Sequence, residues 1–173
     1  DTLNTAISAA LTGHLVLSTV HTNSASSTIT RLIEMGAKDY LVSSTLIGVI
    51  AQRLVRRLCP HCKRPINPSY DDASKVISNP DEIDKFMQMT IYEKKGCDMC
   101  NYTGYSGRLG IFEILQVDRE LKRLIAVGAH DIQIEEVAIA SGMKTLYQSC
   151  LNHIINGDTT ISEFIRVLGP VSA

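Results

Sequence analysis

The chain has 173 residues, enough for one domain or one and a half, and its 45% hydrophobic residues can build a buried core. A formal net charge of −1 excludes a broadly basic surface, and 5% aromatic residues without Trp argue against a stacking platform for single-stranded nucleic acid. No apolar run approaches the ~20 residues of a membrane-spanning helix, so we expect a soluble globular protein that reaches a membrane only through a partner.

The first 36 residues are predicted to alternate helix, strand and helix. Residues 1–13 have apolar side chains at helical spacing and end in glycine, which is typical of a helix. Residues 14–20 are a short apolar run, and we expect a buried central strand there. Residues 24–36 are amphipathic and follow side chains that can cap a helix. Open α/β sheets bind ligands beyond the carboxyl ends of their strands, and His21 stands at that position.

A helical pattern over residues 39–50 is followed by two extended runs that flank the middle of the chain. Residues 52–58 mix charged and β-branched side chains, and residues 109–115 are a matching apolar run. If these runs pair antiparallel, the residues between them form an insertion between neighbouring strands. We expect one or two short helices and high mobility within residues 63–96, which are rich in Pro, Asp, Ser and Lys.

Two Cys-x-x-Cys pairs stand at the ends of this insertion, Cys59 with Cys62 and Cys97 with Cys100. Each pair puts two sulfurs on one tight turn, and two such turns can surround a single Zn²⁺. Closing the intervening loop costs roughly 3 kcal/mol, whereas structural zinc contributes about 10–16 kcal/mol in small peptides. The pattern predicts a structural tetracysteine zinc site without an open position for a substrate water.

Other uses of these cysteines are open at the level of sequence. The four could form two disulfides or be unrelated thiols. Against disulfides, nothing at the N-terminus resembles a signal peptide, and Cys150 stands alone in a helical pattern, where an oxidising compartment would leave it unpaired. His61 lies inside the first turn and could replace a thiolate.

Every segment after residue 117 has a helical pattern. The predicted helices cover residues 118–128, 131–142, 143–156 and 160–168. Thr160 and Glu163 have the spacing of a capping box at the start of the last helix. Together these segments predict a small helical subdomain.

Four stretches carry motifs that occur together in one family. Residues 12–23 read Thr-Gly-His-Leu-Val-Leu-Ser-Thr-Val-His-Thr-Asn, residues 51–59 and 104–110 flank the two cysteine pairs, and residues 157–168 lie near the end. Residues 12–23 resemble the histidine box of the type II secretion and type IV pilus assembly ATPases (GspE-like and PilB-like proteins). Residues 51–59 and 104–110 resemble the borders of the zinc module in these proteins, and residues 157–168 resemble their carboxyl-terminal end. The resemblance covers nearly the whole chain in the right order.

The resemblance implies a fold, an activity and partners. Members are hexameric cytoplasmic P-loop ATPases with a RecA-like motor domain that dock on an inner-membrane platform protein. They drive pseudopilus or pilus assembly and protein secretion across the outer membrane, and the complete protein would use ATP and Mg²⁺ beside the structural Zn²⁺. His14 and His21 would lie near the γ-phosphate, and Arg108 near the bound nucleotide. A histidine at the end of a strand can donate to a phosphate oxygen, although His14 could equally be satisfied by backbone.

The chain departs from this family in one respect. It contains no Gly-x-x-x-x-Gly-Lys-Ser/Thr phosphate loop and no acidic Mg²⁺-binding stretch, and its first two residues align just after that stretch. We therefore expect an α/β fold, the carboxyl-terminal part of a RecA-like P-loop ATPase domain with an inserted tetracysteine zinc-binding module and a C-terminal helical subdomain. The predicted domains are a partial motor domain at residues 1–58 and 104–117, the insertion at residues 59–103 and the helical subdomain at residues 118–173. Alone, such a chain should not hydrolyse ATP.

Two other functions fit parts of the sequence. Five basic residues near the first cysteine pair suggest a zinc-ribbon nucleic-acid-binding protein, although near-neutral charge and scarce aromatic residues argue against it. These residues are Arg53, Arg56, Arg57, Lys63 and Arg64. Arg53, Arg56, Arg57 and Arg108 could instead be solvated or ion-paired. An adaptor that binds a partner through the insertion is the other alternative.

The leading expectation is a cytoplasmic homo-hexamer, peripheral to the inner membrane through its partners, with no nucleic acid and no membrane span of its own.

Overall fold

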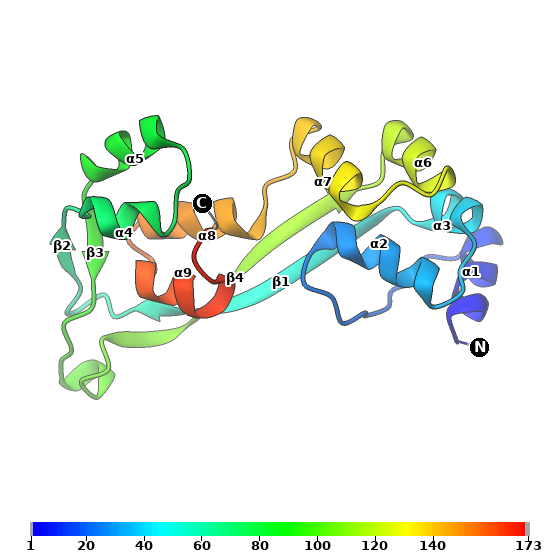
Figure 1. Cartoon of the computed structure of the whole chain (residues 1–173). Helices are drawn as coiled ribbons and strands as arrows, with labels where there is room; N and C mark the ends of the chain where they lie inside the picture. Colours follow the sequence, from blue (N-terminus) through cyan, green and yellow to red (C-terminus); the bar gives the residue numbers. More distant parts are fainter. Residues whose placement is uncertain (1, 172–173) are drawn as a thin grey trace. The chain divides into compact units, whose positions relative to one another are not determined.

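The computed structural model describes residues 2–171, which form helices and two two-stranded sheets (Figure 1). The chain divides into two compact units, unit 1 from residues 1–51 and 113–145 and unit 2 from residues 52–112 and 146–173. Asp1, with which the first predicted helix begins, and residues 172–173, which end the predicted helical subdomain, lie outside the described residues.

The described residues of unit 1 contain five helices that pack on one another. They are α1 (Thr2–Leu11), α2 (Ala25–Glu34), α3 (Asp39–Thr45), α6 (Arg119–Ala126) and α7 (Asp131–Ala140). Helix α3 contacts α1, α2 and α6, and α7 contacts α2 and α6. The fully buried side chains that these contacts enclose are aliphatic, among them Ile29, Leu121, Ile125 and Ile134.

Two helix starts in unit 1, those of α2 and α6, follow the expected capping chemistry. Ser24 caps α2, because its hydroxyl oxygen accepts a hydrogen bond from the Ser27 N–H while the Ser27 hydroxyl oxygen accepts one from the Ser24 N–H. The Asp118 carboxylate accepts a 2.9 Å hydrogen bond from the N–H of Leu121 at the start of α6.

Two long strands, β1 (Gly48–Leu58) and β4 (Tyr105–Gln116), are hydrogen-bonded neighbours. The backbone N–H of Val117 donates to the carbonyl of Ile47 near one end, and the N–H of Cys59 donates to the carbonyl of Gly104 near the other. The two strands therefore run antiparallel, which confirms the predicted pairing of residues 52–58 with 109–115 and lengthens both strands.

The part of unit 2 that the structure describes contains the smaller sheet and four α-helices. Its elements are β2 (Arg64–Ile66), α4 (Tyr70–Ser74), α5 (Pro80–Met87), β3 (Ile91–Glu93), the 3₁₀-helix η1 (Asp98–Cys100), α8 (Leu146–Ile155) and α9 (Ile161–Leu168). Strands β2 and β3 pair antiparallel, with Arg64 opposite Glu93 and Ile66 opposite Ile91. Helix α4 contacts α5, and α8 contacts both α9 and β3. Helices α4 and α5 therefore confirm the expectation of one or two short helices within residues 63–96.

The strand predicted at residues 14–20 is wrong. This stretch has no regular secondary structure, and Leu15 and Leu17 are 73% and 86% exposed. A buried strand needs hydrogen-bonded neighbours and cover on both faces. Within residues 2–171 the strands pair only as β1 with β4 and β2 with β3, so this apolar run has no sheet to join.

The helix predicted over residues 39–50 is too long, because α3 ends at Thr45 and β1 begins at Gly48. A Cβ atom at Gly48 would lie 3.0 Å from the Leu115 carbonyl oxygen, so glycine permits the close approach of β4. The β-branched residues after it suit the strand that this pairing allows. Helix α8 likewise begins at Leu146, three residues later than predicted.

None of the helices in residues 2–171 is long and apolar enough to cross a lipid bilayer.

Candidate metal centre

The two cysteine pairs of unit 2 lie on tight turns at the ends of regular elements. The first turn follows β1 directly, and the backbone N–H groups of Cys62 and Lys63 both donate to the carbonyl of Cys59. The second turn is η1, in which the N–H of Cys100 donates to the carbonyl of Cys97. Each turn thus directs its two sulfurs to the same side.

The structure brings the four sulfurs together. The Sγ atoms of Cys59 and Cys97 are 3.9 Å apart, and Cys100 Sγ is 3.8 Å from both Cys62 Sγ and Cys97 Sγ. All four sulfurs lie within 4.8 Å of one another. Four ligands at ~2.3 Å from one tetrahedral zinc ion stand roughly 3.8 Å apart, so this set has the spacing of a metal site.

Backbone N–H groups supply the outer contacts of the sulfurs. Cys62 Sγ accepts a hydrogen bond from the N–H of Gly96, and Cys100 Sγ accepts from the N–H groups of Cys97 and Gly104. Burial favours the neutral thiol of Cys100, but these two N–H groups, together with hydrogen bonds from the Cys62 and Cys97 side chains, outweigh it and lower the pKa of Cys100 to about 6. Burial and the neighbouring sulfurs raise the pKa of Cys97 to about 11. Metal binding would therefore have to release at least the proton of Cys97.

The alternatives for these cysteines are resolved by the same geometry. All five cysteines are free thiols, and the sulfur separations are far beyond the ~2.05 Å of a disulfide. His61 is exposed and is not one of the four residues that converge. Cys150 lies buried in α8, where burial raises its pKa to about 12 and keeps it a neutral thiol.

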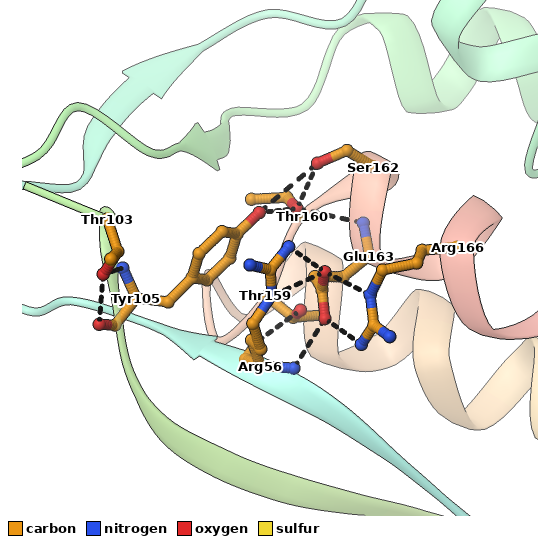
Figure 2. Close-up of polar contacts among 8 residues, drawn as sticks. All are labelled: Arg56, Thr103, Tyr105, Thr159, Thr160, Ser162, Glu163 and Arg166. Atoms are coloured by element: carbon orange, nitrogen blue, oxygen red, sulfur yellow. Dashed lines mark hydrogen bonds and ion pairs between the residues drawn. The ribbon is translucent and has the colours of Figure 1, made fainter.

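Unit 2 also contains a polar network centred on a buried carboxylate, and the sequence did not predict it (Figure 2). The carboxylate of Glu163, in α9, has no exposed surface and accepts hydrogen bonds from the Arg56 and Arg166 guanidinium groups and from the Arg56 N–H. The Arg56 guanidinium also lies 4.2 Å above the ring of Tyr105.

The spacing of Thr160 and Glu163 predicts a capping box, and the structure contains one of its two hydrogen bonds. The Thr160 hydroxyl oxygen accepts a hydrogen bond from the N–H of Glu163 and caps α9. The Glu163 side chain, which in a capping box would reach back to the N-cap, is instead held by the two arginines, because they offer it charged donors.

The residues predicted to contact nucleotide lie outside this cluster. His14 and His21 are exposed in unit 1, on the irregular stretch that follows α1, and His14 Nδ1 lies 3.0 Å from the Thr12 hydroxyl. Arg108 belongs to unit 2 and is exposed on β4.

Comparisons with known proteins agree on one family. The family model of the type II/IV secretion system protein matches residues 1–166. The type IV pilus assembly ATPase TfpB of Acinetobacter baylyi is 44% identical over 97% of this chain and 28% of its own length. The type II secretion system ATPase E of Vibrio cholerae is 41% identical over 96% of this chain and 32% of its own length.

A solved structure is similar in fold. The pilus retraction motor PilT with bound ADP superimposes with a TM-score of 0.60 and 22% identity, over 95% of this chain and 35% of that chain. The chain therefore spans about a third or less of the curated relatives named here.

Proposed function

Because the chain belongs to the type II/IV secretion system protein family, we propose that it is the carboxyl-terminal part of a motor ATPase that assembles a pilus or pseudopilus. The family match over residues 1–166 carries this proposal, and relatives that bear the name ATPase support it. The complete protein would be a cytoplasmic homo-hexamer docked on an inner-membrane platform protein. It would couple ATP hydrolysis, with Mg²⁺, to fibre assembly and to secretion across the outer membrane.

The proposal assigns a role to each part of the chain. Residues 1–58 and 104–117 would belong to the RecA-like motor domain, residues 59–103 to a zinc-binding insertion and residues 118–173 to a helical subdomain. Three consecutive exposed apolar side chains, Leu15, Val16 and Leu17, support the first assignment, because contiguous exposed apolar surface is typical of a contact with further protein.

We propose that Cys59, Cys62, Cys97 and Cys100 hold one structural Zn²⁺. The convergence of the four sulfurs within 4.8 Å of one another supports this ligand set. Zinc with four thiolate ligands links two chain segments and activates no water, so its contribution would be to the stability of the insertion.

In the complete protein, His14 and His21 of unit 1 would contact a bound nucleotide, and Arg108 of unit 2 would, independently of them, lie near a bound nucleotide. All three side chains are exposed in the described chain and are thus available to a phosphate. A positioned imidazole or guanidinium stabilises the charge that develops during phosphoryl transfer.

Two contacts weaken the nucleic-acid-binding alternative. Of the five basic residues that suggested it, Arg56 is ion-paired with Glu163, and Lys63 donates a hydrogen bond to the carbonyl of Gly157. An adaptor role has no comparable observation in its favour.

The motor assignment is tested by measuring magnesium-dependent phosphate release. We expect activity from the complete protein, background release from residues 1–173 alone, and a strong loss in the complete protein with His21→Ala. The matched control is His130→Ala, which removes another exposed histidine of unit 1. Hydrolysis by residues 1–173 alone would contradict the assignment of this chain, and equal activity of the two variants would contradict the role of His21.

A further inference from the structure

We infer that residues 157–163, the segment that leads from α8 into α9, position both cysteine turns and so raise their affinity for the metal. This inference rests on the proposed zinc site and extends it to residues that are not ligands. All the contacts involved lie within unit 2.

The first cysteine turn is held by this segment on both sides. Just before Cys59, the backbone N–H of Leu58 donates a 2.8 Å hydrogen bond to the carbonyl of Asp158. Just after Cys62, the ammonium group of Lys63 donates a 2.7 Å hydrogen bond to the carbonyl of Gly157. The segment therefore fixes the start and the end of the turn that carries two of the four sulfurs.

The second turn reaches the same segment through Tyr105. The residue before it, Gly104, donates its N–H to Cys100 Sγ. The hydroxyl of Tyr105 is hydrogen-bonded to the Thr160 hydroxyl at 2.9 Å, and both residues are buried. Thr160 is also the N-cap of α9, so the second turn is tied to the start of that helix.

Glu163 joins the two sets of contacts. Its Oε2 accepts a 2.8 Å hydrogen bond from the backbone N–H of Arg56, and its Oε1 accepts a 2.6 Å bond from the Arg56 guanidinium. That guanidinium stacks on the ring of Tyr105, so one carboxylate fixes a residue of β1 that in turn contacts the first residue of β4 (Figure 2). The Thr159 hydroxyl adds a 2.8 Å bond to the carbonyl of Arg56.

Contacts that hold ligands in their bound arrangement increase metal affinity, because less ordering is left for binding to accomplish. By linkage, the metal must strengthen the same contacts by the same factor. Groups hydrogen-bonded directly to metal ligands typically contribute about 10-fold to 100-fold in affinity. Glu163 acts one step further out, through Arg56, so its contribution is expected at or below the lower end of that range.

The test is competition for Zn²⁺ between the chain and a chromophoric chelator. Glu163→Gln should weaken zinc binding by several-fold, up to about 10-fold, and the milder Tyr105→Phe, which removes only one hydroxyl, by about 3-fold. Hydrogen exchange supplies the reciprocal measurement. Removing zinc should accelerate exchange of the Leu58 and Arg56 amides, whose acceptors are Asp158 and Glu163.

Two controls separate positioning from general stability. Glu34→Gln makes the same chemical change in the exposed ion pair with Arg31 of unit 1, and Ile154→Val loosens the core of unit 2 at a fully buried site in α8. Both should keep parental zinc affinity. If Glu163→Gln and Tyr105→Phe bind zinc within twofold of the unaltered chain, or if Ile154→Val weakens binding as much as they do, the inference is overturned. Failure of the unaltered chain to bind zinc would overturn the zinc proposal and this inference together.

Discussion

The carboxylate of Glu113, in β4, accepts a 2.7 Å hydrogen bond from the backbone N–H of Ala25, the first residue of α2. Both residues are buried, and they are 88 positions apart in the chain. The first N–H groups of a helix have no partner within it, and the helix dipole favours negative charge there. Glu113 therefore fixes the point at which the stretch containing His21 enters α2.

Replacing Glu113 should destabilise unit 1. We expect Glu113→Ala to lower the free energy of unfolding by about 2 kcal/mol, because a buried N–H loses its acceptor, and Glu113→Gln by about 1 kcal/mol. Urea unfolding followed by circular dichroism measures both values. The control is Glu136→Ala on the exposed side of α7. A loss no larger for Glu113→Ala than for the control would show that the buried contact is dispensable.

Stability should fall in acid because of Glu163. Burial raises its pKa, but hydrogen bonds from Arg166 and Arg56 outweigh burial and lower the pKa from 4.5 to about 2. The ionised carboxylate therefore stabilises the fold above the unfolded pKa near 4.5, and this contribution is lost as the pH falls toward 2. The full contribution is about 3 kcal/mol on the usual conversion.

This pH dependence is measured by unfolding the metal-free chain between pH 7 and pH 2.5, with a chelator present so that thiolate protonation does not contribute. Glu163→Gln carries no titrating group at this site, so its stability should be lower at pH 7 and should change less with pH. Parallel curves for the two chains would assign the acid sensitivity to other carboxyl groups.

The cysteine substitutions test the metal directly. The purified chain should contain one zinc per molecule by atomic emission, and Cys59→Ser or Cys97→Ser should lower both zinc content and melting temperature. Cys150→Ser is the matched control, because this thiol is buried in α8 away from the four converging sulfurs. Undiminished stability of the double variant Cys59→Ser/Cys97→Ser would show that the metal does not hold the insertion.

Alanine substitutions at two glycines with positive φ can distinguish the cost of backbone strain from the cost of a steric clash. A Cβ atom at Gly96 (φ +102°) would lie 2.7 Å from the Tyr102 carbonyl oxygen, whereas Gly107 (φ +76°) has nothing within 4 Å. Gly107→Ala should therefore cost only the ~1–2 kcal/mol of a left-handed residue. Gly96→Ala should cost more, because the clash must shift the backbone. It should also weaken zinc binding, since this shift displaces the Gly96 N–H that donates to Cys62 Sγ. Equal unfolding free energies and zinc affinities in the two variants would contradict the steric argument.

Local patterns predicted much of the fold. Helical spacing and capping residues placed most helices, and the cysteine turns marked the ends of the two strands that pair. The convergence of four sulfurs was predictable because each Cys-x-x-Cys turn holds its own two sulfurs close together, so that only the two turns had to come together.

The wrong prediction at residues 14–20 has a different origin. An apolar run satisfies the pattern of a buried strand, but burial depends on neighbours that the run itself does not specify. Leu15 and Leu17 are exposed because no other strand within residues 2–171 pairs with this stretch.

The network around Glu163 could not be predicted for a related reason. Its ion pair with Arg56 joins positions 107 residues apart, and nothing local distinguishes Arg56 from its neighbour Arg57. The spacing of Thr160 and Glu163 indicated a helix start, which is present, but it gave no sign that the carboxylate would serve a distant strand.

Gly104 links the two cysteine turns through a single residue, since its carbonyl accepts from the N–H of Cys59 and its own N–H donates to Cys100 Sγ. A side chain there would collide with Lys94, because a Cβ atom would lie 2.5 Å from the Lys94 Cβ. Both hydrogen bonds are made by the chain itself, so the ion would strengthen this bridge rather than create it. After a chelator removes the metal, the four cysteines should therefore stay close to their bound arrangement. Zinc should then rebind rapidly, because only local rearrangement of the two turns is needed.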